Sequence, residues 1–200
     1  MPNHNLDRLH HSYLIRIRAT HQTLGIPPDY GVSSLLPAYF ESEQLVSAGK
    51  DIYDRDVFLT TRTLQAWNAL RSAARADSHS LVIVSGFRSV KRQQEIIGRK
   101  IKNGESMSMI LSVNAAPGYS QHHTGCAIDL TNSDSRERPL EEDFELTPSF
   151  EWLNRRAGDF GFRLVYTRDN PWGFIYEPWH WAYAEVQEYE LNPSENNYSG

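Results

Sequence analysis

The chain has 200 residues, of which 40% are hydrophobic and 22% charged, a composition typical of a globular protein with a full hydrophobic core. Asp and Glu outnumber Lys and Arg by 25 to 20, and the resulting net charge of −5 argues against a nucleic-acid-binding protein, which needs a basic face. The single cysteine excludes an intramolecular disulfide and a Cys-X-X-Cys metal site, and it fits a reducing compartment.

The N-terminal residues predict an amphipathic helix, because apolar side chains recur there at helical spacing: Leu6, Leu9, Tyr13, Ile17 and Leu24. The histidines of this stretch are expected on its solvated face: His4, His10, His11 and His21. A secretory signal would place about 7–15 consecutive apolar residues here, whereas Arg16 interrupts the longest apolar run. With Met1 as the native start, we therefore expect a cytoplasmic protein, and the composition predicts no membrane span.

Residues 25–30 contain glycine and two prolines and break the helix, and residues 31–58 are expected to be irregular, with short elements at most. Hydrophobic spacing and β-branched residues then predict a helix over 60–76, a buried strand over 81–84 and a helix over 90–102 that ends at Asn103-Gly104. These three elements form the first part of the predicted core.

The second part begins with a strand over 126–130, whose alternation places Ala127 and Asp129 on one face. A polar, acidic excursion over 131–146 follows, and Thr147-Pro148 resembles a helix start. The remaining elements are a helix that Gly161 closes and strands over 164–166 and 179–183.

Helices that flank short strands, without regular βαβ alternation, predict a single α+β domain with a small, mainly antiparallel sheet. We divide the chain into an N-terminal helix and irregular extension packed on the core (1–58), the core itself (59–190) and a C-terminal tail (191–200).

Two short stretches place histidines close to carboxylates. In Ser120–Asp129, a loop presents His122 and His123, Gly125 turns the backbone, and the strand directs Asp129. In Glu177–Tyr183, strand alternation places His180 on the opposite face from its tryptophan neighbours. Two histidines and one aspartate can hold a catalytic zinc ion and leave the fourth tetrahedral position for water. Taken singly, these residues also fit core or surface histidines with satisfied hydrogen bonds.

Three motifs in the same order resemble the zinc D-alanyl-D-alanine carboxypeptidases of the VanY/VanX type, the LAS metallopeptidases. The pattern S-x-H-x-x-G-x-A-x-D is matched over Ser120–Asp129, and E-x-W-H-x-x-Y over Glu177–Tyr183. Ser85–Ser89 resembles the family's S-G-Y-R-S, with Phe87 in place of Tyr. The motifs span residues 85–183, about half of the chain, and residues 1–58 match no family motif.

The resemblance implies a zinc site on the face of the sheet, with His122, Asp129 and His180 as ligands. It implies that Glu177 is the general base and that Arg88 holds the substrate carboxylate or the developing oxyanion. Ser120 and, by a weaker match, Gln93 would bind substrate. His123 occupies a variable position of its motif and is left out of the metal site. Cys126, Trp179, Trp181 and Tyr183 are expected in the core.

The implied partners are peptidoglycan stem peptides, and the implied reaction is removal of a terminal D-Ala. The motifs do not separate L,D-carboxypeptidases from D,D-carboxypeptidases, dipeptidases or endopeptidases. Because a cytoplasmic enzyme meets recycled muropeptides, we favour an L,D-carboxypeptidase acting on tetrapeptides in cell-wall recycling. A D,D-carboxypeptidase on pentapeptide stems or D-Ala-D-Ala is the alternative.

Two other classes of protein remain as rivals. Ser47-x-x-Lys50, Ser112-Val113-Asn114 and His123-Thr124-Gly125 approximate the motifs of penicillin-binding serine peptidases, although the last two lie unusually close together. A non-enzymatic, zinc-stabilised module that binds cell-wall peptide would keep the metal ligands, but the presence of Glu177 argues against it.

Overall fold

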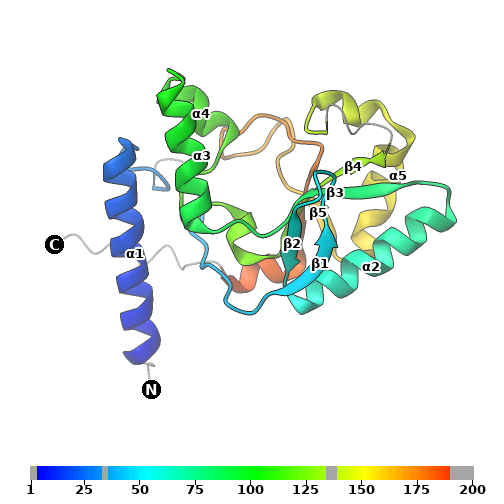
Figure 1. Ribbon diagram of the computed structural model, residues 1–200, viewed down its shortest axis with the longest axis horizontal. Helices are drawn as coiled ribbons and strands as arrows, with labels where there is room; N and C mark the ends of the chain where they lie inside the picture. Colours follow the sequence, from blue (N-terminus) through cyan, green and yellow to red (C-terminus); the bar gives the residue numbers. More distant parts are fainter. Residues whose placement is uncertain (1–3, 33–35, 134–138, 190–200) are drawn as a thin grey trace.

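This computed structural model describes residues 4–32, 36–133 and 139–189. Its strands form two antiparallel sheets (Figure 1). The larger sheet has the strand order β3-β4-β6-β5, formed by Leu81–Ser85, Ala127–Asn132, His180–Tyr183 and Phe162–Leu164. The smaller one is a hairpin of β1 (Val46–Lys50) and β2 (Asp56–Leu59). Together with the flanking helices, these sheets confirm the predicted α+β fold.

The helices are α1 (His4–Leu24), α2 (Thr61–Ala76), α3 (Val90–Lys102), α4 (Met107–Val113) and α5 (Pro148–Arg156). Four of these described helices begin at a hydroxyl-bearing residue whose side chain accepts a hydrogen bond from the first turn: Thr60, Ser89, Ser106 and Thr147. Pro148 occupies the first helical position of α5, as its sequence predicts. Local capping chemistry therefore sets most of these helix starts.

The two faces of the larger sheet meet different surroundings. Ile128, Leu130 and Trp181 belong to an apolar cluster that also contains side chains of α2 and α5, such as Leu70 and Leu153. On the other face, Asp129 lies directly opposite His180 in the β4–β6 register. Ala182, two residues along β6, packs in the separate cluster of α1, α3 and α4, which gather away from α2 and α5 in Figure 1.

Two described elements were not predicted. The β1–β2 hairpin lies almost entirely within residues 31–58, where short elements at most were expected, and it extends to Leu59, which is buried in the core together with Val57. The helix α4 follows the Asn103-Gly104 turn after only a few residues. Ser106, its N-cap, was the signal available in the sequence.

The strand predicted over 164–166 lies earlier in the chain, at Phe162–Leu164. Gly161 ends the preceding 3₁₀ turn with a φ of +79°, which glycine tolerates, and the chain enters the strand at the next residue. Val165 and Tyr166 consequently leave the sheet, and Tyr166 becomes available to the site described below.

The N-terminal helix α1 packs through Tyr13 and Ile17, as its hydrophobic spacing predicts, and also through Leu14. The prediction that all of its histidines are solvated was wrong for His21, which is buried and lies 2.8 Å from the carbonyl oxygen of Pro117. His11 is exposed. The side chains of His4 and His10, like the tail at 191–200, lie outside the described residues.

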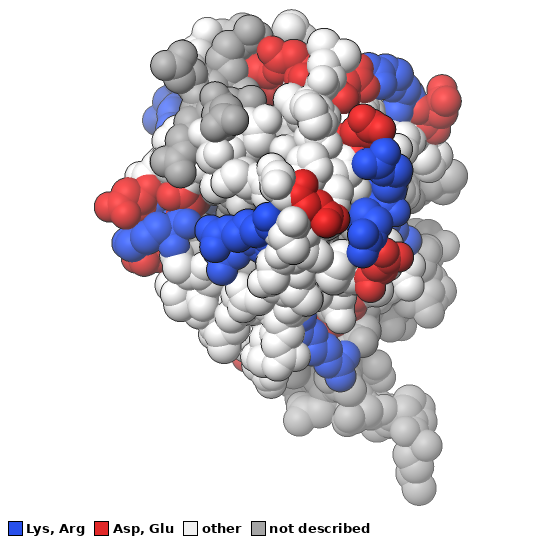
Figure 2. Space-filling view, turned by 90° about the vertical axis from the view of Figure 1, so that its right-hand side faces the viewer, with Lys and Arg blue, Asp and Glu red and all other residues white. Residues whose placement is uncertain are grey.

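The surface in Figure 2 carries acidic and basic side chains interspersed with each other, and neither sign dominates this face. Among the described residues, no helix has the combined length and apolar character needed to cross a membrane.

Candidate functional site

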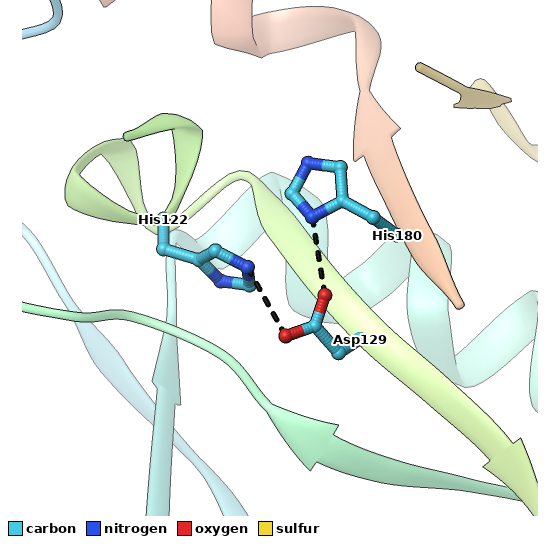
Figure 3. A group of neighbouring side chains, drawn as sticks. All are labelled: His122, Asp129 and His180. Carbon is cyan, nitrogen blue, oxygen red and sulfur yellow. Dashed lines mark hydrogen bonds and ion pairs between the residues drawn. The ribbon is translucent and has the colours of Figure 1, made fainter. Parts of the chain in front are cut away.

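Three buried side chains from a loop and two neighbouring strands meet on the polar face of the sheet (Figure 3). One potential ligand atom from each of His122, Asp129 and His180 lies within 4.8 Å of the others. Asp129 Oδ2 is 3.3 Å from His122 Nε2, and Oδ1 is 3.1 Å from His180 Nδ1. The structure therefore brings together the three residues predicted as metal ligands, and we call them the His–Asp–His group.

The loop that carries His122 is a 3₁₀ turn, η1 (Gln121–Thr124), fixed at both ends. At its start, the Ser120 hydroxyl accepts a hydrogen bond from the backbone N–H of His122. At its end, Gly125 adopts a φ of +69°, and a Cβ there would lie 2.6 Å from the Leu45 side chain. The positive φ favours glycine at this position of the motif, and any larger residue would also require the Leu45 side chain to move.

In each of the two histidines, the ring nitrogen that does not face Asp129 has a hydrogen-bond partner, and this shows which nitrogen is available to a metal. Nδ1 of His122 lies 2.7 Å from the Gly86 carbonyl oxygen, which can only accept, so Nδ1 carries the proton and Nε2 has a free lone pair. Nε2 of His180 lies 2.9 Å from Gln121 Oε1, which leaves Nδ1 facing Asp129. Two imidazole nitrogens and one carboxylate oxygen are a donor set that zinc prefers, so the residues fit a zinc ion.

Burial controls the charges of this group. It lowers the pKa of His122 to about 4, and the neighbouring Arg88 adds to this effect, although Asp129 opposes it. Burial opposes ionisation of Asp129, but His122 and His180 outweigh it and hold the pKa of that carboxyl below its usual range. Neutral His122 beside a carboxylate is the ionisation state that a cation requires.

A cavity of about 130 Å³ lies over the His–Asp–His group. Glu177, Arg88 and Ser120, all predicted site residues, line it. Burial, together with the negative charge of Asp129, raises the pKa of Glu177 to about 8, and Arg88 partly offsets this increase. Glu177 therefore lies close to the His–Asp–His group without being part of it.

The guanidinium of Arg88 is held in position by two neighbouring side chains. Its Nη1 donates to Gln93 Oε1 at 3.1 Å, and its Nη2 lies 3.8 Å from Asp129 Oδ2. Gln93 is fully buried and donates to the Ala115 carbonyl at 2.6 Å. The structure therefore places Gln93 behind Arg88 rather than among the residues that line the cavity, and its predicted contact with substrate stays a prediction.

The other predicted assignments have clear positions. Both ring nitrogens of His123 bond to backbone groups, Nδ1 to the carbonyl of Arg88 and Nε2 to the N–H of Gly118, so His123 is not oriented to bind a metal. Cys126 and Trp181 are buried in the core, whereas Trp179 also lines the cavity. Lys50 of the serine-peptidase pattern lies on exposed β1, paired with Asp56.

Sequence reasoning missed three residues at this site. The ring of Tyr166 lies 4.7 Å from that of His180 and lines the cavity. Asn114 also lines it, and its Oδ1 is buried without a hydrogen-bond partner among the described residues. Gln121 contacts His180. Tyr166 was expected in a strand, Asn114 was part of the serine-peptidase pattern, and Gln121 occupies an unspecified position of its motif, so none of the three was assigned to this site.

Comparison with known proteins decides the family. The family profile described as VanY, D-alanyl-D-alanine carboxypeptidase, matches residues 56–186. The chain belongs to the VanY family. A putative carboxypeptidase of Bacillus subtilis (strain 168), YodJ, is 31% identical over 158 residues, which cover 74% of this chain and 56% of YodJ. This chain thus spans about half the length of this curated VanY relative.

Solved structures share the fold. A structure reported as the LdcB LD-carboxypeptidase superposes with a TM-score of 0.65 at 26% identity, covering 72% of this chain and 70% of LdcB. A VanY D,D-pentapeptidase from a VanB-type vancomycin resistance cassette, solved in complex with Zn(II), has a TM-score of 0.59. It is 23% identical and covers 78% of this chain and 89% of its own. The VanY fold is therefore compatible with more than one type of carboxypeptidase.

Proposed function

We propose that this chain is a zinc-dependent carboxypeptidase that removes the terminal D-Ala from peptidoglycan stem peptides. The observation that carries the proposal is the buried His–Asp–His group at the base of a cavity that Glu177 and Arg88 also line. A metal-stabilised binding module would need the ligands but not a half-buried carboxylate beside them, such as that of Glu177. Glu177 therefore favours the enzyme over the module.

His122, Asp129 and His180 would hold the zinc ion. When bound, zinc supplies a Lewis acid that polarises the scissile carbonyl and makes water more acidic. Glu177 accepts the proton of the attacking water and passes it to the amine of the departing D-Ala as the C–N bond breaks. A cation held by Asp129 would neutralise the charge of that carboxylate, which is one of the two causes that raise the pKa of Glu177. Its removal would favour the ionised, basic form of Glu177.

Recognition of the substrate terminus falls to Arg88. Its guanidinium is always charged and presents a planar fork that matches a carboxylate, and Gln93 holds that fork in place. Ser120 lines the cavity and would bond the peptide backbone of the substrate. Such a pair selects a free C-terminus, which is the feature that distinguishes a carboxypeptidase from an endopeptidase.

We favour a tetrapeptide stem, cleaved at the bond between an L-centre and D-Ala. Similarity to the LdcB LD-carboxypeptidase at 26% identity supports this choice. The alternative is a D,D-carboxypeptidase acting on pentapeptide stems, which the description of the family itself supports.

Mass spectrometry of defined muropeptides tests both choices. Tetrapeptide and pentapeptide stems are incubated side by side with zinc-loaded protein and with chelator-treated protein. We expect zinc-dependent loss of one D-Ala from the tetrapeptide. Loss from the pentapeptide alone would establish the D,D alternative, and no loss from either would contradict the carboxypeptidase assignment.

A further inference from the structure

The ring nitrogen of His180 that does not face Asp129, Nε2, is hydrogen-bonded to Gln121, a residue that the family motif leaves unspecified. Gln121 Oε1 lies 2.9 Å from His180 Nε2, and Gln121 Nε2 donates to the Tyr39 hydroxyl at 3.1 Å. All three side chains are buried, at 2%, 3% and 3% exposure for His180, Gln121 and Tyr39. We propose that Gln121, oriented by Tyr39, is a positioning residue that keeps the Nδ1 lone pair of His180 free for the metal; this inference rests on the proposed zinc site.

The chemistry of a neutral imidazole makes this contact decisive. Such a ring carries one N–H, so His180 can present a lone pair at Nδ1 only if the proton is on Nε2. An N–H buried at Nε2 needs an acceptor, and Gln121 Oε1 supplies one at hydrogen-bonding distance. The contact therefore stabilises the tautomer that binds metal.

A carboxamide can also turn by half a rotation and exchange its oxygen and nitrogen. Turned in this way, Gln121 would donate to His180 Nε2, and the ring proton would move to Nδ1, where Asp129 Oδ1 at 3.1 Å would accept it. That arrangement cannot bind a metal through Nδ1. With Gln121 Nε2 donating to Tyr39, Oε1 is the atom that faces His180.

Tyr39 comes from a part of the chain that precedes the residues matched by the family, 56–186. Its backbone N–H donates to the Gly118 carbonyl at 2.8 Å, and its carbonyl accepts from the Tyr13 hydroxyl of α1 at 2.7 Å. The backbone N–H of Ser42 bonds to the carbonyl of His123 in η1. The extension is thus connected to the ligand loop at several points, and it completes the surroundings of His180.

Zinc affinity measured by competition with a chromophoric chelator tests this inference on the full chain. We expect Gln121→Met, which removes both polar atoms but keeps the length, to weaken zinc binding by about 10- to 100-fold. Tyr39→Phe removes one hydrogen-bond partner of the carboxamide and should weaken binding by about 2- to 10-fold. Gln121→Glu offers only acceptors when ionised and should bind at least as tightly as the wild type.

Gln65→Met is the matched control, since Gln65 is exposed on α2. Nitrogen-15 NMR of the histidine rings reads the tautomer directly. We expect the proton of His180 on Nε2 in the wild type and a shift toward Nδ1 in metal-free Gln121→Met. A purely structural role would lower thermal stability without moving the tautomer.

The outcomes separate this inference from the proposed function. If the wild type binds zinc and both Gln121→Met and Tyr39→Phe bind it within about twofold with the same tautomer, the positioning role is overturned and the zinc site stands. If the wild type itself does not bind zinc, both are overturned. Should Gln121→Met fail to fold, Tyr39→Phe and Gln121→Glu still decide the question, because each changes few atoms.

Discussion

The two faces of strands β4 and β6 differ in what stabilises them. On one face, Ile128, Leu130 and Trp181 are buried among apolar side chains, and burial itself is favourable. On the other, Asp129 and His180 are as deeply buried, but burial of polar side chains is unfavourable unless they are hydrogen-bonded, so they depend on specific partners. Substitutions on the apolar face of β4 and β6 should therefore change mainly the free energy of unfolding. Substitutions on the polar face should change mainly metal binding and turnover.

The largest expected effect is on turnover. Glu177→Gln keeps the shape of the side chain but cannot accept a proton, so we expect kcat to fall by about 10²- to 10⁴-fold. Zinc content and thermal unfolding should stay close to those of the wild type, because Glu177 is not part of the His–Asp–His group. Kinetics with metal analysis checks this, and Glu151→Gln on exposed α5 is the control. Normal turnover in Glu177→Gln would rule out the assigned base.

The opposite face should give the reverse result. Leu130 is fully buried, and Leu130→Ala should lower the free energy of unfolding by about 2–5 kcal/mol. Zinc affinity of the folded fraction should be little changed, because the side chain points away from the metal face. Leu146, at 81% exposure, provides the control, and Leu146→Ala should shift stability by less than about 0.5 kcal/mol. Chemical denaturation with parallel zinc titration measures both quantities.

Metal removal acts on the polar face alone. Zinc that binds the folded state but not the unfolded state stabilises the protein by about 2.7 kcal/mol at a free concentration of 100 times its Kd. We therefore expect a chelator to lower the Tm of the wild type. In His180→Ala, zinc and chelator should give the same Tm, and a persistent zinc-dependent shift there would place the metal elsewhere.

Substrate recognition should respond at Arg88. Arg88→Ala removes the charged fork, and we expect kcat/KM to fall by about 10- to 150-fold, as for loss of a hydrogen bond to a charged group. Zinc should be retained, because Arg88 Nη2 is 3.8 Å from Asp129 and contributes no ligand atom. Arg92→Ala, half-exposed on α3, is the control. Release of metal by Arg88→Ala would point to a structural role.

The smallest expected effect concerns a buried histidine away from the metal. Burial lowers the pKa of His21 below 6.5, so the unfolded chain binds more protons than the folded one as the pH falls below that value. Its contribution to stability is therefore present above pH 6.5 and lost on acidification. We expect His21→Phe to lose less stability than the wild type between pH 7 and pH 5 in denaturation experiments. An equal loss would contradict this role.

The predictable part of the molecule is the part governed by local chemistry. The helices α2, α3 and α5 have hydrophobic spacing and hydroxyl caps within their own sequences, and alternation placed Asp129 and His180 on the correct faces of their strands. Gln121, Tyr39, Asn114 and Tyr166 could not be predicted in the same way. Their roles depend on contacts between distant segments, such as the 82 positions that separate Tyr39 from Gln121.

The antiparallel register of β4 and β6 has a consequence for quality control of the folded protein. Asp129 and His180 are cross-strand partners, so a slip of one residue would turn one of them to the opposite face. A chain with shifted pairing could retain a similar strand content and still lack a site with all three ligands. Stoichiometric metal uptake would then measure the fraction of molecules whose strands are correctly aligned, which optical measures of secondary structure cannot distinguish.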